Sequence, residues 1–459
     1  VGVSSREKIK PSRPTPSHLK THNLSLLDQV VPRKYVPLLL YYDGKKAASI
    51  NNTDTRCNVI KKSLAETLTK FYVLAGKIVD DEIEKFVDCN DDGVDFCETR
   101  VSNFQLSQVI KEPAAGLFEQ VKLLLPFDPC DHEITASGAF LLSVQVNVFE
   151  EDCGGMVIGL CINHKVADAS SIATFVNDWA TVARGMVSND DDEYVGQIKG
   201  PCYHQVQSLF PQKENGIGFK ITSSPIDGTL VTKKFAFDAS KLAQLKERCK
   251  LTTKEPEDDG YKPSRVEALS AFLWKCFIDI DQAKVAPPPP AKVYLATNAV
   301  NIRPRMVPKL PTNSFGNIIA ITNAVFSIDD NNNECTGIND HGYYPKLVQK
   351  FRDATKKIDG EYIEAMRSTD LLLNTMMKLI EHVLGGNTLM IFFSSWCRFP
   401  LYETDFGWGK PIWVSTCAIP QKNVIVLMDS DSYGDGIEAY VTLAKEDMLE
   451  FEHHVELLA

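Results

Sequence analysis

The sequence predicts a mixed α/β protein built from two halves, and three observations support this prediction. The chain has 459 residues, about three times a typical domain of roughly 150 residues, which favours two or three domains. Apolar residues make up 44% of it, as in a globular protein with a full core. Strand-like runs and amphipathic helical patterns alternate in both halves, with an acidic, then Pro-, Gly- and Ser-containing segment between them at 188–224.

The first half opens with strand, turn and helix signals. Residues 24–42 are apolar but contain two prolines, which favours strand and turn over one long helix. Residues 82–126 alternate strand-like pieces with turns that contain Asp and Gly. Between these segments, residues 60–78 predict a helix that stops at Gly76, because apolar side chains recur there at helical spacing: Leu64, Leu68, Phe71 and Tyr72.

Two strands and a helix follow in the middle of the chain. Residues 139–149 and 155–163 are β-rich runs joined by a polar turn, and the second is apolar on both faces, as in a buried interior strand. Residues 170–184 predict an amphipathic helix from one apolar stripe: Ile172, Phe175, Val176 and Trp179.

The second half repeats the alternation. A strand is expected from about residue 229, and a helix over 238–250. Ser264 and Glu267 form a capping-box pattern at the start of a further helix. After an Asn/Asp-rich loop at 328–341 and a helix-rich stretch at 345–385, the chain closes with strands near 389–395, 412–418 and 423–428 and a helix near 446–458.

Charge and cysteine usage narrow the classes of partner. The formal net charge is −11, so the chain lacks the basic footprint of a protein that binds nucleic acid or an anionic membrane. Its twelve cysteines are scattered without regular spacing, which indicates reduced thiols and a cytoplasmic protein. No apolar run reaches the roughly 18 residues of a transmembrane helix. We therefore expect neither nucleic acid nor a membrane as a partner.

The strongest candidate for chemistry is His164, followed by Asp168. A histidine at the end of an interior strand is held rigidly and suits a general base. The alternative from the residues alone is that Asp168 caps the next helix and His164 is a satisfied core residue. A metal site is not predicted, because no second His/Cys cluster has ligand spacing and His453 and His454 are neighbours that point apart on a helix.

Two further segments stand out. Residues 405–409 place two glycines around Trp408, which predicts a tight turn with a packed indole. Residues 301–305 and 315–317 supply Asn, Arg and Gly after an apolar strand, and a solvated basic loop is the alternative. The chain lacks the G-x-x-x-x-G-K-[ST], G-x-G-x-x-G and G-x-S-x-G patterns, so nucleotide triphosphatases, dinucleotide oxidoreductases and serine hydrolases of that type lose support.

These features, in this order, resemble the plant BAHD acyltransferase family. The resemblance is carried by His164-Lys-Val-Ala-Asp168 and Asp405-Phe-Gly-Trp-Gly409. Weaker matches cover nearly the whole chain: Pro14-Thr-Pro16, Leu24-Ser25, Leu27-Asp28, Leu74-Ala-Gly76, Cys89-Asn-Asp91 with Gly93-Val94, Ser264-Arg-Val-Glu-Ala-Leu269, and Asn301-Ile-Arg303 with Phe315-Gly-Asn317.

The resemblance implies two similar domains, each a mixed β-sheet flanked by helices, as in chloramphenicol and carnitine acetyltransferases. The domains would be residues 1–187 and 225–459, joined by a crossover linker at 188–224, with an active-site channel between them. The implied substrates are acyl-CoA, most simply acetyl-CoA, and a small-molecule alcohol. No permanently bound cofactor is implied, and the family suggests a monomer.

The resemblance also assigns roles to residues. His164 would act as general base through Nε2, with Trp408 and, more weakly, Asn317 as donors to the oxyanion. Asp168 would be structural, pairing with Arg303. Asp405, Gly407 and Gly409 would shape a turn. For CoA the candidates are Ser264 and Arg265, at a helix start that offers N–H groups to phosphate, together with Asn301 and Arg305.

Substrate choice is less determined. Asn163-His-Lys-Val-Ala-Asp-Ala-Ser-Ser171 with Phe175-Val-Asn-Asp-Trp-Ala180 resembles the alkaloid-acetylating clade of the family. The segment between residues 317 and 405 is longer than that clade leads us to expect. Three alternatives stay open: a hydroxycinnamoyl or benzoyl transferase, a non-catalytic member that binds a ligand, and an enzyme that acylates amines.

Overall fold

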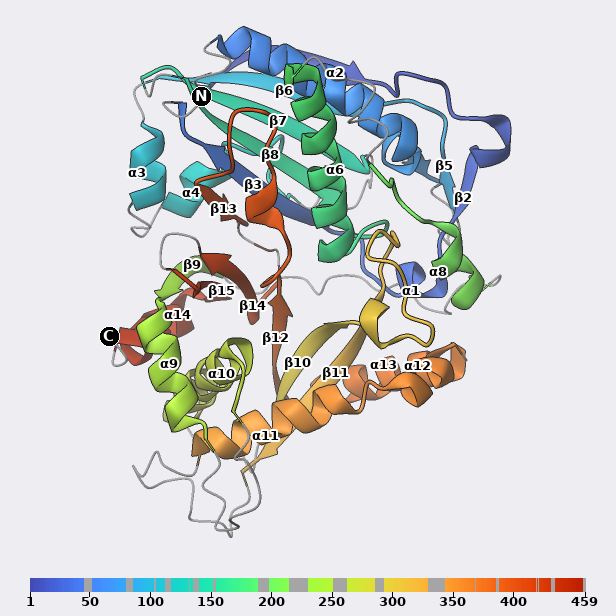
Figure 1. Cartoon of the computed structure of the whole chain (residues 1–459). Helices are drawn as coiled ribbons and strands as arrows, with labels where there is room; N and C mark the ends of the chain where they lie inside the picture. The colour runs from blue at the N-terminus through green and yellow to red at the C-terminus, as the bar shows by residue number, and fades with distance from the viewer. Residues whose placement is uncertain are drawn as a thin grey trace. The chain divides into compact units, whose positions relative to one another are not determined.

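The computed structural model divides the chain into two compact units (Figure 1). The first comprises Val1–Ser224, Lys309–Ile318 and Arg398–Pro420, and the second Pro225–Pro308, Ile319–Cys397 and Gln421–Ala459. The structure describes residues 1–44, 52–79, 86–102, 105–111, 117–131, 133–134, 140–151, 154–188, 198–213, 230–250, 262–284, 293–328, 343–367, 369–384, 388–417, 419, 421–430 and 434–456.

The units differ from the predicted domains in one respect. The first boundary, after Ser224, coincides with the end of the predicted linker. However, segments 309–318 and 398–420 belong to the first unit, whereas the sequence placed both in the C-terminal domain. Strand pairing accounts for the second segment, because Trp413–Ser415 adds to the edge of the first unit's sheet beside residues 39–41, and Ser314 of the first segment forms a β-bridge with Cys202. Within the predicted linker only 198–213 are described, and of the Asn/Asp-rich loop at 328–341 all residues after Ile328 lie outside the described residues, which resume at 343.

A six-stranded mixed sheet forms the centre of the first unit. Only β6 and β7 pair in parallel; the other neighbours are antiparallel. Every residue of β8 is buried, which confirms the predicted interior strand. The strand order is β1 (Gly2–Ile9), β6 (Val94–Val101), β7 (Leu142–Phe149), β8 (Gly155–Asn163), β3 (Tyr35–Tyr42) and β13 (Trp413–Ser415).

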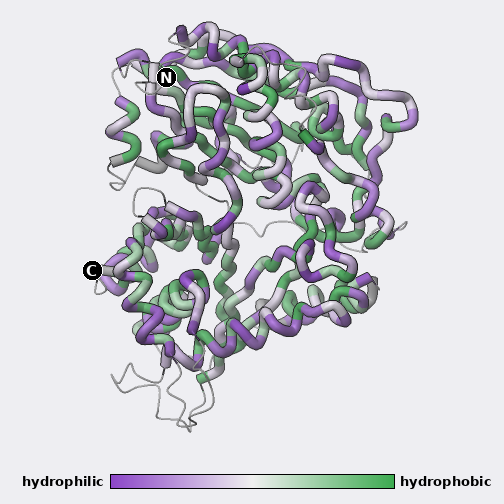
Figure 2. Tube along the Cα trace, viewed as in Figure 1, coloured by the Kyte–Doolittle hydropathy of each residue, from purple (hydrophilic) through white to green (hydrophobic). Residues whose placement is uncertain are grey.

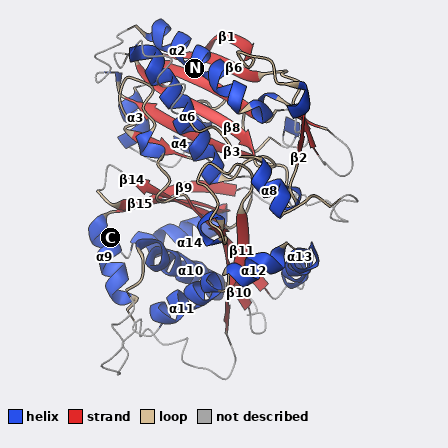
Figure 3. Ribbon diagram, turned by 45° about the vertical axis from the view of Figure 1, so that its right-hand side comes forward, coloured by secondary structure: helices blue, strands red, loops and turns tan. Residues whose placement is uncertain are grey.

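Helices cover both faces of this sheet (Figures 1 and 3). On one face α2 (Thr53–Lys70) and α6 (Ala169–Ser188) lie side by side, and the Trp179 indole donates to Ser63 Oγ at 3.0 Å. On the other face α3 (Leu106–Lys111) and α4 (Leu117–Lys122) pack on side chains of β3 and β8. The unit also contains α1 (Leu26–Gln29), α8 (His204–Leu209) and a small sheet of β2 (Thr21–Asn23), β5 (Phe86–Asp88) and β4 (Lys77–Ile78).

The second unit has its own six-stranded mixed sheet. Its order is β11 (Ile319–Ser327), β10 (Val293–Asn301), β12 (Thr388–Ser395), β14 (Val424–Ser430), β15 (Gly436–Ala444) and β9 (Leu230–Phe237). The pairs β10–β12 and β12–β14 are parallel, and the other neighbours are antiparallel. Its helices are α9 (Ala239–Arg248), α10 (Arg265–Ala283), α11 (Tyr343–Lys356), α12 (Gly360–Met366), α13 (Thr369–Leu384) and α14 (Lys445–Glu456).

The hydropathy pattern matches this layering. Figure 2 shows apolar residues along the central strands of each sheet. The second unit's core gathers side chains of α9, α10, α11 and α14 on one face of its sheet. No helix within the described ranges is long and apolar enough to cross a membrane. Among the same residues no disulfide forms, and no group of three or more His, Cys, Asp or Glu is placed to hold a metal ion.

Candidate active site

His164 lies directly after β8, in the turn that leads to α6. Its backbone N–H donates to the carbonyl of Lys34 at 2.8 Å, which continues the β3–β8 ladder by one residue. The ring is half-buried. Because an interior strand and a long helix anchor the turn at both ends, the imidazole starts from a rigid backbone.

The Asn317 side chain fixes the tautomer of His164. Nδ1 of His164 lies 3.0 Å from Oδ1 of Asn317. The Asn317 amide nitrogen donates one hydrogen to Asp28 Oδ1 at 2.9 Å and the other to the His164 carbonyl at 2.7 Å. Since both amide hydrogens are used, Oδ1 must accept, so Nδ1 of His164 carries the proton and Nε2 carries the lone pair. The same count argues against the predicted oxyanion role of Asn317.

Asp28 holds the asparagine in place. One carboxylate oxygen accepts from the N–H of Asn317 and from its amide, each at 2.9 Å. The other accepts from the N–H of Ser25 at 2.9 Å and from its hydroxyl at 2.6 Å, which completes a capping box on α1. Burial raises the pKa of the Asp28 carboxyl, while these four donors pull it down. The network thus runs from α1 through Asn317 to His164.

The pKa of His164 is shifted strongly. Burial, and next the positive charge of Lys34, lower the pKa of His164 to about 4, whereas Asp168 and the Asn317 side chain act to raise it. At neutral pH the imidazole is therefore uncharged, which is the form that a general base needs.

Asp168 is a structural residue in this arrangement. One carboxylate oxygen accepts from the N–H of Ser171 at 2.8 Å, in the first turn of α6. The other accepts from the N–H of Ile318 at 3.0 Å, beside Asn317. The expected helix cap is confirmed, and the carboxylate also ties the Asn317 segment to α6. Arg303 belongs to the second unit, so its pairing with Asp168 stays a prediction.

Asp405 organises the turn that contains the two glycines. Its Oδ1 accepts from the N–H of Gly407 at 2.8 Å and from that of Gly409 at 2.9 Å. Both glycines have positive φ, +106° and +107°, which side-chain-bearing residues adopt at a cost. These contacts support the predicted architectural role of all three residues.

Trp408 lies far from His164. Its ring stacks on that of Phe406, with the ring centroids 5.7 Å apart, and contacts the Tyr42 ring edge-on, with the centroids 6.3 Å apart. Tyr42 is the last residue of β3, whereas Tyr35, the first, pairs with Asn163, the residue before His164. Tyr35 and Tyr42 are seven residues apart on the strand, which corresponds to roughly 23 Å. This distance argues against the predicted oxyanion role of Trp408. Its indole N–H is buried, with no hydrogen-bond partner among the described residues.

The first pair of predicted CoA contacts lies at the start of α10. The capping box of Ser264 and Glu267 is confirmed: the Ser264 hydroxyl accepts from Glu267 N–H and the Glu267 carboxylate from Ser264 N–H. Arg265 forms ion pairs with Asp429 at 3.3 Å and Asp435 at 2.8 Å. Both residues are thus engaged within the second unit, and their contact with CoA stays a prediction.

The second pair of predicted CoA contacts, Asn301 and Arg305, lies at and just after the end of β10. Asn301 Oδ1 accepts from the N–H of Arg303 at 3.1 Å. Arg305 donates to the carbonyls of Thr355 and Ile358, at 2.8 and 2.7 Å, and so closes the end of α11. These contacts give Arg305 a structural task, and its role toward phosphate likewise stays a prediction.

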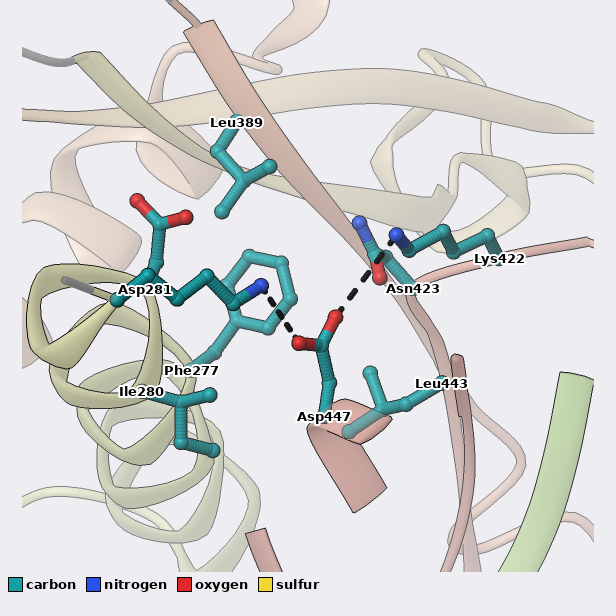
Figure 4. Close-up of a pocket in the computed structure, with 9 residues that line it drawn as sticks. Phe277, Ile280, Asp281, Leu389, Lys422, Asn423, Leu443 and Asp447 are labelled. Atoms are coloured by element: carbon teal, nitrogen blue, oxygen red, sulfur yellow. Dashed lines mark ion pairs between the residues drawn. The ribbon is translucent and has the colours of Figure 1, made fainter. Parts of the chain in front are cut away.

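A small pocket in the second unit does not suit a substrate (Figure 4). Its volume of about 30 Å³ is close to that of one water. Asp447 pairs there with Lys284 at 2.5 Å and Lys422 at 3.8 Å, and the Asn423 Oδ1 is buried without a partner among the described residues. Because the space is this small, we assign the pocket no catalytic role.

Two residues near His164 escaped the sequence reasoning. Asp28 was recognised as part of a family pattern but given no role, although the Ser25-x-x-Asp28 spacing is itself a capping-box signal. Lys34 had no signal of its own, because its place opposite His164 depends on the register of β3 against β8.

The comparisons with known proteins decide the family. The Transferase family model matches residues 1–458. The chain belongs to this family, the BAHD acyltransferases. It is 36% identical over 99% of its length to limonoid 1-O-acetyltransferase of Citrus sinensis, covering 96% of that protein. It is 35% identical over 97% of its length to stemmadenine O-acetyltransferase of Catharanthus roseus, covering 94% of that protein.

Solved structures agree with the fold of this BAHD member. Vinorine synthase superposes with a TM-score of 0.80 at 31% identity, over 100% of this chain and 98% of that one. A protein of F. graminearum, solved with coenzyme A and deoxynivalenol, superposes with a TM-score of 0.67 at 16% identity, over 94% and 97% of the two chains. The predicted fold class of two sheet-rich domains is confirmed, and the protein is an acyl-CoA-dependent alcohol O-acyltransferase.

Proposed function

We propose that this enzyme transfers the acetyl group of acetyl-CoA to a hydroxyl of a polycyclic plant metabolite, with Nε2 of His164 as the general base. One observation carries the proposal: the Asn317 amide accepts from Nδ1 of His164 at 3.0 Å. That contact leaves the Nε2 lone pair as the basic site of the ring. The names of the relatives support an alkaloid- or limonoid-type alcohol as acceptor.

The reaction needs one base and two proton movements. Nε2 of His164 takes the hydroxyl proton as the oxygen attacks the thioester carbonyl, so the C–O bond forms and a tetrahedral oxyanion appears. When the oxyanion collapses, the C–S bond breaks, and the departing thiolate takes the proton back from the imidazolium. The products are the ester and free CoA, with no acyl-enzyme. General-base help of this kind is typically worth about 10²–10⁴ in rate.

The electrostatics of the site fit a base that is ready at neutral pH. Because burial and Lys34 hold the pKa of His164 at about 4, almost every enzyme molecule carries the unprotonated ring at pH 7. The hydrogen bond from Nδ1 to Asn317 stabilises the imidazolium that forms during attack, since it opposes the lowering of the His164 pKa.

We further propose that the enzyme acts in the cytoplasm as a monomer.

The test is thiol release from acetyl-CoA by wild type and His164→Ala, over a panel of alkaloid and limonoid alcohols. We expect release that depends on the acceptor and falls at least about 100-fold in the variant. His453→Ala, an exposed position on α14, should release thiol like wild type. Release from benzoyl- or hydroxycinnamoyl-CoA instead would contradict the acetyl donor. Activity that survives His164→Ala, or appears with amines, would contradict the base.

A further inference from the structure

Lys34 and His164 face each other across two strands. Tyr35 of β3 pairs with Asn163 of β8, and the ladder continues through the bond from His164 N–H to the Lys34 carbonyl, 2.8 Å long. Residues directly opposite in an antiparallel pair point to the same face, with Cβ atoms about 4.5–5.5 Å apart. The Lys34 side chain therefore starts alongside the imidazole.

The ammonium of Lys34 has no acid partner in the part of the chain that the structure describes. The side chain is half-buried, and burial alone lowers the pKa of Lys34, to about 8. Among the described residues no carboxylate forms an ion pair with it. The carboxylates nearest to His164 serve other donors: Asp28 holds Ser25 and Asn317, and Asp168 holds backbone N–H groups.

The charges near His164 are of both signs: that of Asp168 acts to raise the pKa of the ring, whereas that of Lys34 lowers it. The next residue, Lys165, is buried, and its ammonium donates to the Gln29 carbonyl at 3.0 Å. The effect of Lys34 reaches the base, since its charge is the second cause of the lowered pKa of His164. Burial of a charge, even in part, favours a partner for it, and here the protein supplies none within the described residues.

We propose that the acceptor supplies the partner, and that Lys34 determines acceptor specificity. Its ammonium donates a hydrogen bond to a ketone or ester oxygen that the acceptor carries beside the reacting hydroxyl. The same charge repels acceptors with a protonated amine at that place. The substrate class is thus a neutral, oxygenated polycyclic alcohol, or an alkaloid whose amine lies remote from the hydroxyl. This inference rests on the proposed function, because the hydroxyl must reach Nε2 of His164.

Recognition of the acceptor suits Lys34 better than stabilisation of the oxyanion. Oxyanion donors work by being held fixed where the charge develops, whereas a lysine ammonium sits on a flexible four-carbon stem. Such a group can follow a carbonyl whose position varies from one acceptor to the next. A binding role also predicts that the effect of Lys34 depends on the acceptor, which an oxyanion role does not.

The test uses matched pairs of polycyclic steroid and terpenoid alcohols. Both members of a pair share one ring system and one hydroxyl, and the neighbouring carbon carries a ketone in one member and a tertiary amine in the other. Binding is measured by calorimetry on the full chain, and turnover separately by thiol release from acetyl-CoA. The variants are Lys34→Met, which keeps the length but not the charge, and Lys34→Arg, which keeps the charge. Lys62→Met, at an exposed position of α2, is the control.

We expect wild type to bind the ketone member at least about tenfold more tightly, as for one hydrogen bond to a charged group. Lys34→Met should lose this preference, while Lys34→Arg and Lys62→Met should keep it. The inference is overturned if wild type binds both members equally, if neither member of any pair binds, or if Lys34→Met lowers kcat for both members alike with binding unchanged. A binding preference without any thiol release would instead sink the proposed function and leave the role of Lys34 supported.

Discussion

Nδ1 of His164 and Oδ1 of Asn317 lie 3.0 Å apart and join residues that are 153 positions apart in the sequence. The contact has a direction, because both amide hydrogens of Asn317 are committed to Asp28 and to the His164 carbonyl. It turns a histidine at a strand end into a base with one defined tautomer. The arrangement is similar to a catalytic triad in the roles of its members. The neutral amide of Asn317 orients the ring, and the buried carboxylate of Asp28 holds that amide.

Asn317→Ala should therefore reduce kcat more than it changes KM for the acceptor. Without the amide oxygen, the ring loses the contact that selects its tautomer and that stabilises the imidazolium. We expect a loss of at least about tenfold in kcat, which is smaller than the loss expected when the base itself is removed. Steady-state kinetics with acetyl-CoA and a saturating acceptor alcohol measure it.

A matched control lies in the same segment. Asn313 also bonds through its side-chain amide, to the Gly200 carbonyl at 2.7 Å, but does not touch His164. Asn313→Ala should cost a comparable amount of thermal stability and leave kcat near wild type. If both variants lose activity in proportion to their melting temperatures, Asn317 acts on stability alone and the tautomer argument fails.

The sequence predicted elements whose signals are local. The apolar stripe of α6, the uniform burial of β8 and the capping box at Ser264 each depend on neighbours within a few residues, and each is confirmed. By contrast β1, with the polar sequence Gly2–Ile9, was not predicted, because an exposed edge strand carries no apolar alternation. The strand β15 was missed although it is fully buried. The predicted helix over 60–78 begins and ends earlier, at Thr53 and Lys70.

The difference between local and long-range signals also decides which residues of the active site could be predicted. His164 and Asp168 stand in one short motif and could be named from it. Asn317 was named from the family resemblance alone, and its contact with His164 could not be predicted, because its hydrogen-bond partners lie 153 and 289 residues away in the chain. The oxyanion role of Trp408 came from the family resemblance, since a sequence motif gives no distance to His164. Lys34 became visible only through strand register.

Asp168→Asn should lose both stability and activity. Each carboxylate oxygen accepts a backbone N–H, from Ser171 and from Ile318. An asparagine can present only one oxygen, so its NH₂ group must face one of these donors, which costs about 1–3 kcal/mol. The melting temperature should fall, and thiol release should fall further because the Asn317 segment loosens.

Asp359→Asn separates this effect from the loss of a helix cap as such. Asp359 caps α12 through one oxygen, which accepts from Tyr362 N–H at 2.9 Å. That substitution should leave activity unchanged. An Asp168→Asn enzyme with wild-type melting and full activity would show that the carboxylate does not fix the histidine turn.

The two glycines around Trp408 offer a matched pair of substitutions. Gly407 and Gly409 have nearly equal φ values, +106° and +107°, so alanine meets the same backbone strain at both. A Cβ at Gly407 would lie 2.7 Å from a methyl of Val187, whereas no atom of a described residue lies within 4 Å of one at Gly409. Gly407→Ala should therefore be less stable than Gly409→Ala by about 1–3 kcal/mol, the usual cost of overpacking.

Urea unfolding of the two variants measures that difference in free energy. Adding Val187→Ala to Gly407→Ala should recover part of the loss, because the methyl groups in the way are removed. The same addition to Gly409→Ala should only destabilise. Equal stabilities of the two single variants would mean that the turn shifts away from α6 at little cost.

The pH profile of activity tests the environment of His164. An ordinary imidazole, with a pKa of about 6.5, loses its basic form tenfold per pH unit below that value. Burial and Lys34 lower the pKa of His164 to about 4. Because the base is the unprotonated form, a lower pKa extends activity toward acid. We expect kcat/KM to stay level from about pH 8 down to about pH 5 and to fall only below that.

Lys34→Met supplies the internal comparison for this profile. Removing a positive charge beside the ring lets it bind a proton more readily, so the acid limb should move to higher pH. Lys62→Met, remote from the ring, should leave the limb in place. Samples held at pH 5 and assayed at pH 7 must regain full activity, which separates titration from unfolding. A wild-type profile that falls through pH 6.5 would show that the imidazole is not desolvated, and the argument from burial would be wrong.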